Sequence, residues 1–177
     1  MTRFHPALVA LHWLLAILIV LALVLGGTVL AEIPNDAPEK LTALQAHMII
    51  GITILVLTLI RIGVRFTAAD PAELKGEKPL QKKASAAIHG LLYLGVLVMA
   101  TSGLGLAYLA GLPDIVFGGS GAAVPADFAE FTPRLVHGLV SKLLMALIAL
   151  HLLAALYHQF IVKDGLLRRM WFGNRQG

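Results

Sequence analysis

Four stretches of this chain are long and apolar enough to cross a lipid bilayer as helices, which takes roughly 20 residues each. We place them at about residues 6–31, 41–60, 84–112 and 135–162. Apolar residues make up 58% of the 177 residues and charged residues 14%, and the mean hydropathy is +0.84. These values are typical of a membrane protein rather than a soluble domain. The sequence predicts an all-α integral membrane protein, a four-helix transmembrane bundle that forms one domain over residues 1–177.

The connections between the spans differ in character. The first, AEIPNDAPEK, holds two prolines between polar residues and ends the first span. The second, RFTAADPAELKGEKPLQKK, is predicted to be a polar loop with at most one short helical turn. The third, GLPDIVFGGSGAAVPADFAEFTPR, is moderately apolar, so we expect it to lie against the outer membrane surface. The apolar run of about 26 residues in the first span exceeds a signal-peptide core, so we expect this span in the mature protein.

Basic residues indicate the orientation, because cytoplasmic loops are enriched in Lys and Arg. Eleven of the 14 lie in the N-terminal segment, in the second loop with its flanks, or in the C-terminal tail. The two opposite connections contain only Lys40 and Arg134. Both termini are therefore predicted to be cytoplasmic, and in a bacterium the other two connections face the periplasm. The net charge of +4 is explained by this topology and does not indicate a nucleic-acid partner.

Histidines recur inside the spans, and the predicted orientation gives each one a depth. His137 and His151 begin and end the run HGLVSKLLMALIALH, and fourteen helical residues rise about 21 Å and return to within about 40° of the same face. An outer layer then holds His47 and His137. The inner layer holds His12, His89 and His151, with His158 below it at the cytoplasmic boundary, while His5 precedes the first span.

Two layers of histidines favour a cofactor. Interhelical hydrogen bonds explain a single buried histidine, but five or six such costly residues indicate a functional cavity. The chain has no cysteine, which excludes thiolate metal sites and covalent C-x-x-C-H haem. Zinc fits less well than iron because it prefers four tetrahedral ligands. One pair per layer suits two bis-histidine haems, with His12, His89 and His151 in competition for the inner pair.

Residues fourteen positions from the histidines offer further support. Gly26 and Gly103 stand at this spacing after two of the inner histidines and leave the room that a flat macrocycle needs, although close helix packing explains them equally well. Arg61 follows His47 at the same spacing, where its guanidinium is suited to bind a haem propionate. Ordinary anchoring at the cytoplasmic surface explains Arg61 equally well.

The motifs LHWLLAILIVLALVLG, HMIIGITILVLTLIRIGVR, HGLLYLGVLVMATSGLGL and HGLVSKLLMALIALHLLAALYHQFIVKDGLLRRM resemble the successive spans of the prokaryotic cytochrome b561 family. The resemblance covers nearly the whole chain apart from the 113–134 connection. It implies a bundle that binds two non-covalent haems b and exchanges electrons with quinone. It also implies the axial ligand pairs, which are His12 with His151 and His47 with His137. Only the resemblance leaves His89 out of the inner pair.

The resemblance implies electron transfer in the bacterial inner membrane between a small periplasmic donor and a quinone such as ubiquinone. Reducing a quinone takes two electrons and two protons, so a titratable group near the inner layer is useful. His158 is the first candidate and His89 the second for this quinone site, and Lys78, Lys82 and Lys83 are weaker ones. For His158 the alternative is an interfacial histidine in water.

The nature of the donor stays open at this point. Some free-standing family members are oxidoreductases that pass an electron from superoxide to ubiquinone. The outer connections carry a net charge of −4, which would repel an anionic donor unless a local patch near Arg134 and Lys142 reversed it. Lys142 is better explained by snorkelling. One alternative is a cytochrome b membrane anchor for a separate dehydrogenase or hydrogenase. Another is a histidine-lined transporter without a cofactor, although we see none of the expected repeats.

Overall fold

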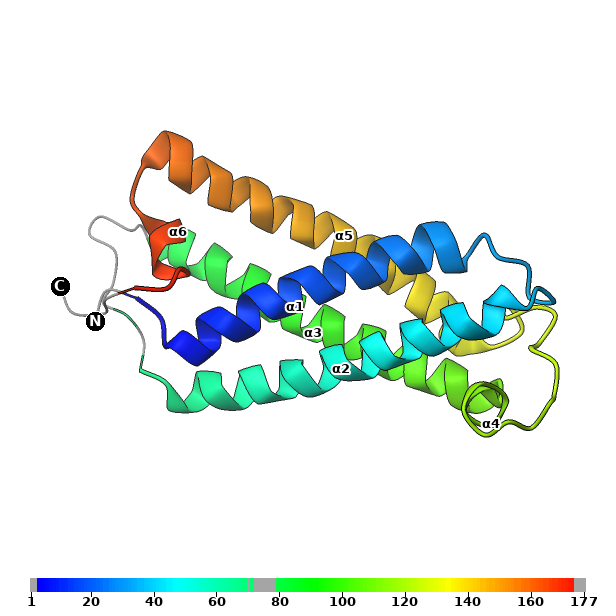
Figure 1. The fold of residues 1–177 in the computed structure, drawn as a ribbon. Helices are drawn as coiled ribbons and strands as arrows, with labels where there is room; N and C mark the ends of the chain where they lie inside the picture. Colours follow the sequence, from blue (N-terminus) through cyan, green and yellow to red (C-terminus); the bar gives the residue numbers. More distant parts are fainter. Residues whose placement is uncertain (1–2, 70, 72–78, 174–177) are drawn as a thin grey trace.

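The computed structural model describes residues 3–69, 71 and 79–173. Four long helices dominate it, namely α1 (Pro6–Val24), α2 (Glu39–Thr67), α3 (Pro79–Leu109) and α5 (Thr132–Tyr157) (Figure 1). α1 and α5 continue as π-helical segments, η1 (Leu25–Leu30) and η2 (His158–Val162). The short helices α4 (Leu112–Val116) and α6 (Leu166–Arg169) lie at opposite ends of the bundle (Figure 1). The described residues contain no strand, so the all-α prediction is confirmed.

Each of the four predicted spans corresponds to one helix that is long and apolar enough to cross a membrane. Their outward faces expose large apolar side chains such as Ile17, Leu139 and Leu153, which are 64%, 66% and 63% accessible. Soluble monomers rarely expose apolar surface on this scale. Lipid is therefore the solvent that these faces require.

The helix ends differ from the predicted spans. α2 continues to Thr67, seven residues beyond the predicted end, and α3 begins at Pro79 and ends at Leu109, before the predicted limit of 112. Hydrophobicity reports the thickness of the hydrocarbon layer, whereas the backbone hydrogen bonds of a helix continue into water. Lys82 and Lys83 therefore belong to the first turns of α3 and not to the predicted polar loop, while Lys78 lies outside the described residues.

Neighbouring long helices run antiparallel (Figure 1). α1 packs on α2, α2 on α3 and α3 on α5, whereas α1 and α5 come close to each other in few places among the described residues (Figure 1). The bundle therefore consists of two hairpins, α1–α2 and α3–α5, that are joined chiefly through α2 and α3.

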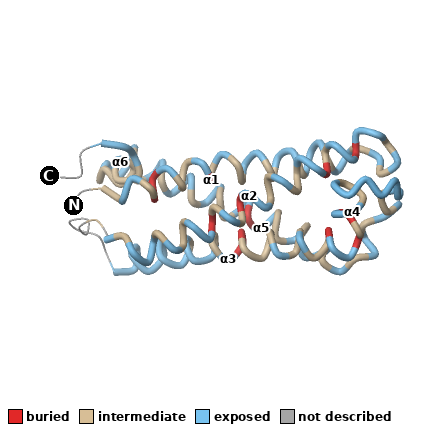
Figure 2. The backbone as a smooth tube through the Cα atoms, turned by 60° about the horizontal axis from the view of Figure 1, so that its bottom comes forward, coloured by how far each residue is buried: buried red, intermediate tan, exposed pale blue. Residues whose placement is uncertain are grey.

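A layer of four aliphatic side chains, one from each long helix, crosses the middle of the bundle. It consists of Leu15, Ile54, Val96 and Leu144, and its members are buried. Buried positions lie near the middle of the bundle in Figure 2. Leu144 lies seven residues from both His137 and His151, which is about two helical turns, so all three share a face at successive heights. The aliphatic layer therefore separates the outer histidines from the inner ones.

The end of the bundle that carries α4 is closed by its own connections. Val124, Phe128 and Phe131 of the 113–134 connection pack on a buried cluster at this end. This packing on the protein accounts for the apolar character that led us to expect the connection on the membrane surface. Lys40 is only 5% accessible and donates from Nζ to the carbonyls of Leu30 and Ile33, each at 2.8 Å.

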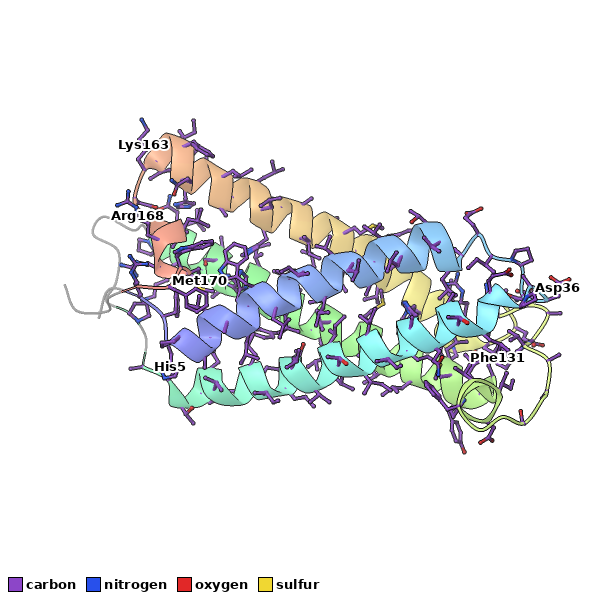
Figure 3. The ribbon with its side chains drawn as sticks, in the orientation of Figure 1. His5, Asp36, Phe131, Lys163, Arg168 and Met170 are labelled. Atoms are coloured by element: carbon purple, nitrogen blue, oxygen red, sulfur yellow. The ribbon has the colours of Figure 1, made fainter. Side chains whose placement is uncertain are left out.

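At the opposite end the first and last described segments meet. The Arg3 guanidinium donates from Nη1 to the carbonyls of Arg168, Trp171 and Phe172 at 3.0–3.1 Å. The indole N–H of Trp13 donates to the carbonyl of Met170 at 2.7 Å, which places the C-terminal segment beside α1 (Figure 3). His5 caps the start of α1 by accepting the N–H of Ala7. Both ends of the described chain therefore lie on one side of the bundle.

Candidate haem-binding site

The predicted outer layer brings together His47 from α2 and His137 from α5. Their ring centroids lie 6.1 Å apart and their planes differ by 75°. The Nδ1–H of His137 donates to the carbonyl of Met99 at 3.1 Å, and the hydroxyl of Ser102 lies 3.2 Å from the same nitrogen. Because a carbonyl only accepts, Nδ1 must carry the proton, and the lone pair of the neutral ring is then on Nε2. α3 thereby prepares His137 as a ligand through Nε2.

The predicted inner layer brings together three rings around His151. His12 of α1 lies at a centroid distance of 6.2 Å and His89 of α3 at 5.3 Å, each with its plane at 72° to that of His151. The Nδ1 of His89 lies 3.4 Å from the hydroxyl of Ser85, one turn earlier in α3. The structure thus places all three candidate inner histidines together.

The separations of two pairs fit an iron ion between the rings. Histidine nitrogens bind metal ions at about 2 Å, so two opposed imidazoles on one ion have centroids about 6 Å apart. The pairs His47–His137 and His12–His151 match this value at 6.1 and 6.2 Å, whereas His89 lies closer to His151. Edge-to-face packing alone also gives separations in this range. The ring spacing alone therefore does not identify a haem site, and the space around the rings must fit a haem as well.

Two cavities adjoin the outer pair. One, of about 110 Å³, reaches from His47 to His137 and is lined by apolar residues of all four long helices, including Ile54 and Met99. The other, of about 430 Å³, lies between the outer halves of α1 and α2 with their connection, and His47 also lines it. Unfilled space therefore adjoins the outer pair of histidines, and His47 borders both cavities.

The glycines predicted to leave room for a macrocycle lie against the histidine rings of the outer layer. Gly26 of η1 lies against His47, and Gly103 of α3 lies against His137. Each glycine thus packs on the outer histidine of a neighbouring helix. Each glycine stands fourteen residues after the inner histidine of its own helix. This spacing returns to nearly the same helix face, so the glycine faces the outer layer as the histidine faces the inner one.

Arg61 lies at the level of the inner layer. Its Nη1 donates to the carbonyl of Leu8, one turn before His12, which ties α2 to α1. A guanidinium has five N–H donors, so this bond leaves others for a propionate. Thr58, one turn before Arg61, is 2% accessible, and its hydroxyl has no hydrogen-bond partner in the described structure. Such an orphaned buried hydroxyl is suited to a bound polar group, and the sequence analysis did not single it out.

His158 lies below the inner layer as predicted, but it has a partner that the sequence analysis missed. Its Nδ1 lies 2.5 Å from Oδ2 of Asp164, in the turn that follows η2. The side chains of His158 and Asp164 are 24% and 20% accessible. The signal available in the sequence was the KDG turn directly after the fourth span. Met99 and Ser102 were also missed, because their contacts with His137 depend on how α3 meets α5.

The helical bundle, its lipid-facing surface and its internal histidine pairs define a class of protein, the membrane-embedded b-type cytochromes that transfer electrons through haem b. A comparison with known families agrees. The model of the prokaryotic cytochrome b561 family matches residues 3–173, and the chain belongs to that family. It is thus a bacterial membrane protein.

Curated relatives match over almost their full lengths. Cytochrome b562 of Cereibacter sphaeroides is 34% identical over 92% of this chain and 90% of the relative. The probable superoxide oxidase CybB of Yersinia pestis is 28% identical, over 92% of both chains. Cytochrome b561 homolog 1 of Escherichia coli is 28% identical over 96% of this chain and 97% of the relative. The resemblance stated from the span motifs is therefore confirmed.

Proposed function

We propose that this single-domain chain binds two haems b, and that it carries electrons between a small periplasmic donor and a membrane quinone such as ubiquinone. His47 and His137 would hold the iron of the outer haem through their ring nitrogens, and His12 and His151 would hold that of the inner one. The main observation in support is that the two histidine pairs have nearly equal ring-centroid distances, 6.1 and 6.2 Å, and lie on either side of the aliphatic layer. The haems supply one-electron chemistry when bound.

The residues of the chain supply ligation, position and a low dielectric. His137 is held by α3 with Nε2 available, which supports its role as an iron ligand. Arg61 and Thr58 provide donors for the polar edge of the inner haem. His158 and, second to it, His89 serve the quinone, whose reduction consumes protons at the inner side.

The orientation belongs to the proposal as well. The chain lies in the inner membrane with both termini in the cytoplasm, so the side where Arg3 meets the C-terminal segment is the cytoplasmic one. The end closed by α4 then faces the periplasm. Lys40 at that end is buried and bound to carbonyls, so its charge is held inside the fold rather than offered at the surface.

Two observations bear on the identity of the electron donor. The similarity to the probable superoxide oxidase CybB of Yersinia pestis supports superoxide as a candidate donor. The acidic outer connections of this chain instead favour a cationic donor, because summed charge steers association. The alternative function, a membrane anchor for a separate dehydrogenase or hydrogenase, would supply electrons from a protein partner. Co-purification of a second polypeptide would favour that alternative, and turnover by the isolated chain would count against it.

The deciding experiment measures haem per polypeptide and the reduced-minus-oxidised visible spectrum of the purified chain in detergent. We expect two b-type haems. His47→Ala and His12→Ala should each lose one of them, while His89→Ala and the control His5→Ala should retain both. A single haem in the unmodified chain, or loss of a haem in His89→Ala, would refute the proposed ligand pairs.

A further inference from the structure

Below the inner layer, His158 and Asp164 form a short polar contact. The distance of 2.5 Å between Nδ1 and Oδ2 is short for a hydrogen bond, as is common where the acceptor is an ionised carboxylate. The second carboxylate oxygen, Oδ1, accepts the backbone N–H of Leu166 at 2.9 Å. Both carboxylate oxygens are thus engaged, so Asp164 holds one fixed orientation toward the ring.

The backbone around the pair is specialised to form it. α5 widens into the π-helical segment η2 at His158, and such segments are frequent at functional sites. Lys163 then adopts φ 58°, a left-handed conformation that is uncommon for a residue other than glycine, and its side chain points away from the bundle (Figure 3). The left-handed turn at Lys163 reverses the chain and brings Asp164 back to His158.

The surroundings keep the carboxyl group charged. Burial raises the pKa of Asp164, but the hydrogen bonds from His158 and from the Leu166 N–H outweigh this effect and hold the pKa below its ordinary value. The Tyr157 ring lies edge-on to the His158 ring at a centroid distance of 5.9 Å. His151 stands one helical repeat further into the membrane on the same helix. Both members of the pair are partly accessible, so protons can exchange with water.

We propose that Asp164 is a positioning residue that orients His158 to deliver protons from the cytoplasm to the quinone, an inference that rests on the proposed function. Because Nδ1–H donates to Asp164, the other nitrogen, Nε2, is the one that faces the remaining surroundings. The carboxylate stabilises the imidazolium form between proton uptake and proton release, as in other carboxylate–histidine pairs.

The proton balance is simple. Conversion of a quinone into a quinol takes two electrons, which come from the periplasmic donor, and two protons. His158 breaks its Nε2–H bond as a new O–H bond forms on a quinone oxygen. It then recovers a proton from cytoplasmic water and transfers the second one in the same way. Asp164 stays ionised throughout and loses no proton.

The test compares Asp164→Asn, Asp164→Glu and a matched control in the full-length chain with its haems bound. Asp127 is the control, because its Oδ1 accepts the N–H of Ala129 at 2.8 Å, as Asp164 does with Leu166, but at the opposite end of the bundle. Reoxidation of the reduced haems by ubiquinone-1 is followed by stopped-flow spectroscopy between pH 5.5 and 9. Haem content and spectra establish that each variant is folded.

We expect Asp164→Asn to keep both haems but to slow reoxidation by about ten- to a hundredfold, with the largest loss at high pH, where protons are scarce. Asp164→Glu should recover most of the rate, and Asp127→Asn should match the unmodified chain. An unchanged rate in Asp164→Asn, or a loss that is equal at every pH, would overturn the positioning role alone. Failure of the unmodified chain to react with the quinone would instead overturn the proposed function, and this inference with it.

Discussion

Gly26 lies so close to His47 that a Cβ atom at this glycine would stand 3.1 Å from Cε1 of the ring and 3.4 Å from Nδ1. A contact of 3.1 Å is tighter than most Cβ contacts in proteins, so the ring must move by a few tenths of an ångström. We expect Gly26→Ala to alter the spectrum or midpoint potential of the outer haem and leave the inner one unchanged. The neighbouring Gly27 has nothing within 4 Å, so Gly27→Ala is the control. If the two variants had the same spectrum and midpoint potential, the outer haem would be insensitive to the position of the His47 ring.

The contact between Arg61 and the Leu8 carbonyl permits a second role for Arg61 at the inner haem. Arg61→Met removes a positive charge, which should lower the midpoint potential of the inner haem by about 50 mV if the charge acts from about 10 Å at an intermediate dielectric. Arg61→Lys keeps the charge and should lower the potential much less. Redox titration followed in the visible spectrum measures both. If Arg61→Met reduces thermal stability with no change in potential, Arg61 is only a tie between α1 and α2.

Lys40 contributes to stability at the outer end rather than to electron transfer. Lys40→Met should leave the carbonyls of Leu30 and Ile33 without their charged donor and should cost roughly 2 kcal/mol of folding free energy. Lys83→Met, at an exposed position early in α3, should cost less than roughly 0.5 kcal/mol. Thermal unfolding in detergent, followed by release of haem, compares the two. Slower electron transfer in Lys40→Met at full stability would contradict this assignment.

The Arg3 contacts hold the C-terminal segment against the bundle. Arg3→Gln should weaken the bonds to three carbonyls and expose the peptide bonds after Arg168 and Arg169 to trypsin. We expect the variant to lose about 1.5 kcal/mol of the free energy that holds the C-terminal segment on the bundle. This loss corresponds to roughly tenfold faster cleavage when detachment of the segment is in rapid equilibrium. Thr28→Ala, at the opposite end, removes only a bond within its own helix and should cleave at the normal rate. Mass spectrometry of the released fragment gives the rates.

Acid should loosen the same segment through Asp164. The pKa of this carboxyl is lower in the folded chain than its ordinary value, so its ionised form stabilises the fold. That contribution is complete above the ordinary carboxyl pKa of about 3.9 and is lost as the pH falls through the lower folded value. Fluorescence of Trp13 and Trp171, whose rings lie 5.6 Å apart, should report the change below pH 4. Asp164→Asn should remove this pH dependence, and its persistence in that variant would exclude Asp164 as the cause.

The sequence by itself determined the four spans and the two histidine layers. A chain in lipid must satisfy its backbone hydrogen bonds internally, so apolar stretches of this length become helices. Within one helix, spacing fixes height and direction, and His137, Leu144 and His151 therefore share a face at successive heights. The span positions and the faces of residues within a helix are local properties, so the sequence of one segment is enough to predict them.

Only the tertiary structure decided which side chains meet across helices. That Gly26 rests on His47, that Met99 orients His137 and that Lys40 is buried all depend on the packing of segments far apart in the sequence. The helix ends also escaped prediction, because backbone hydrogen bonds carry α2 beyond the apolar stretch. Asp164 reaches His158 only because Lys163 takes a left-handed turn. Residue spacing along one helix does not predict such contacts, because they depend on the shapes of two surfaces that pack together.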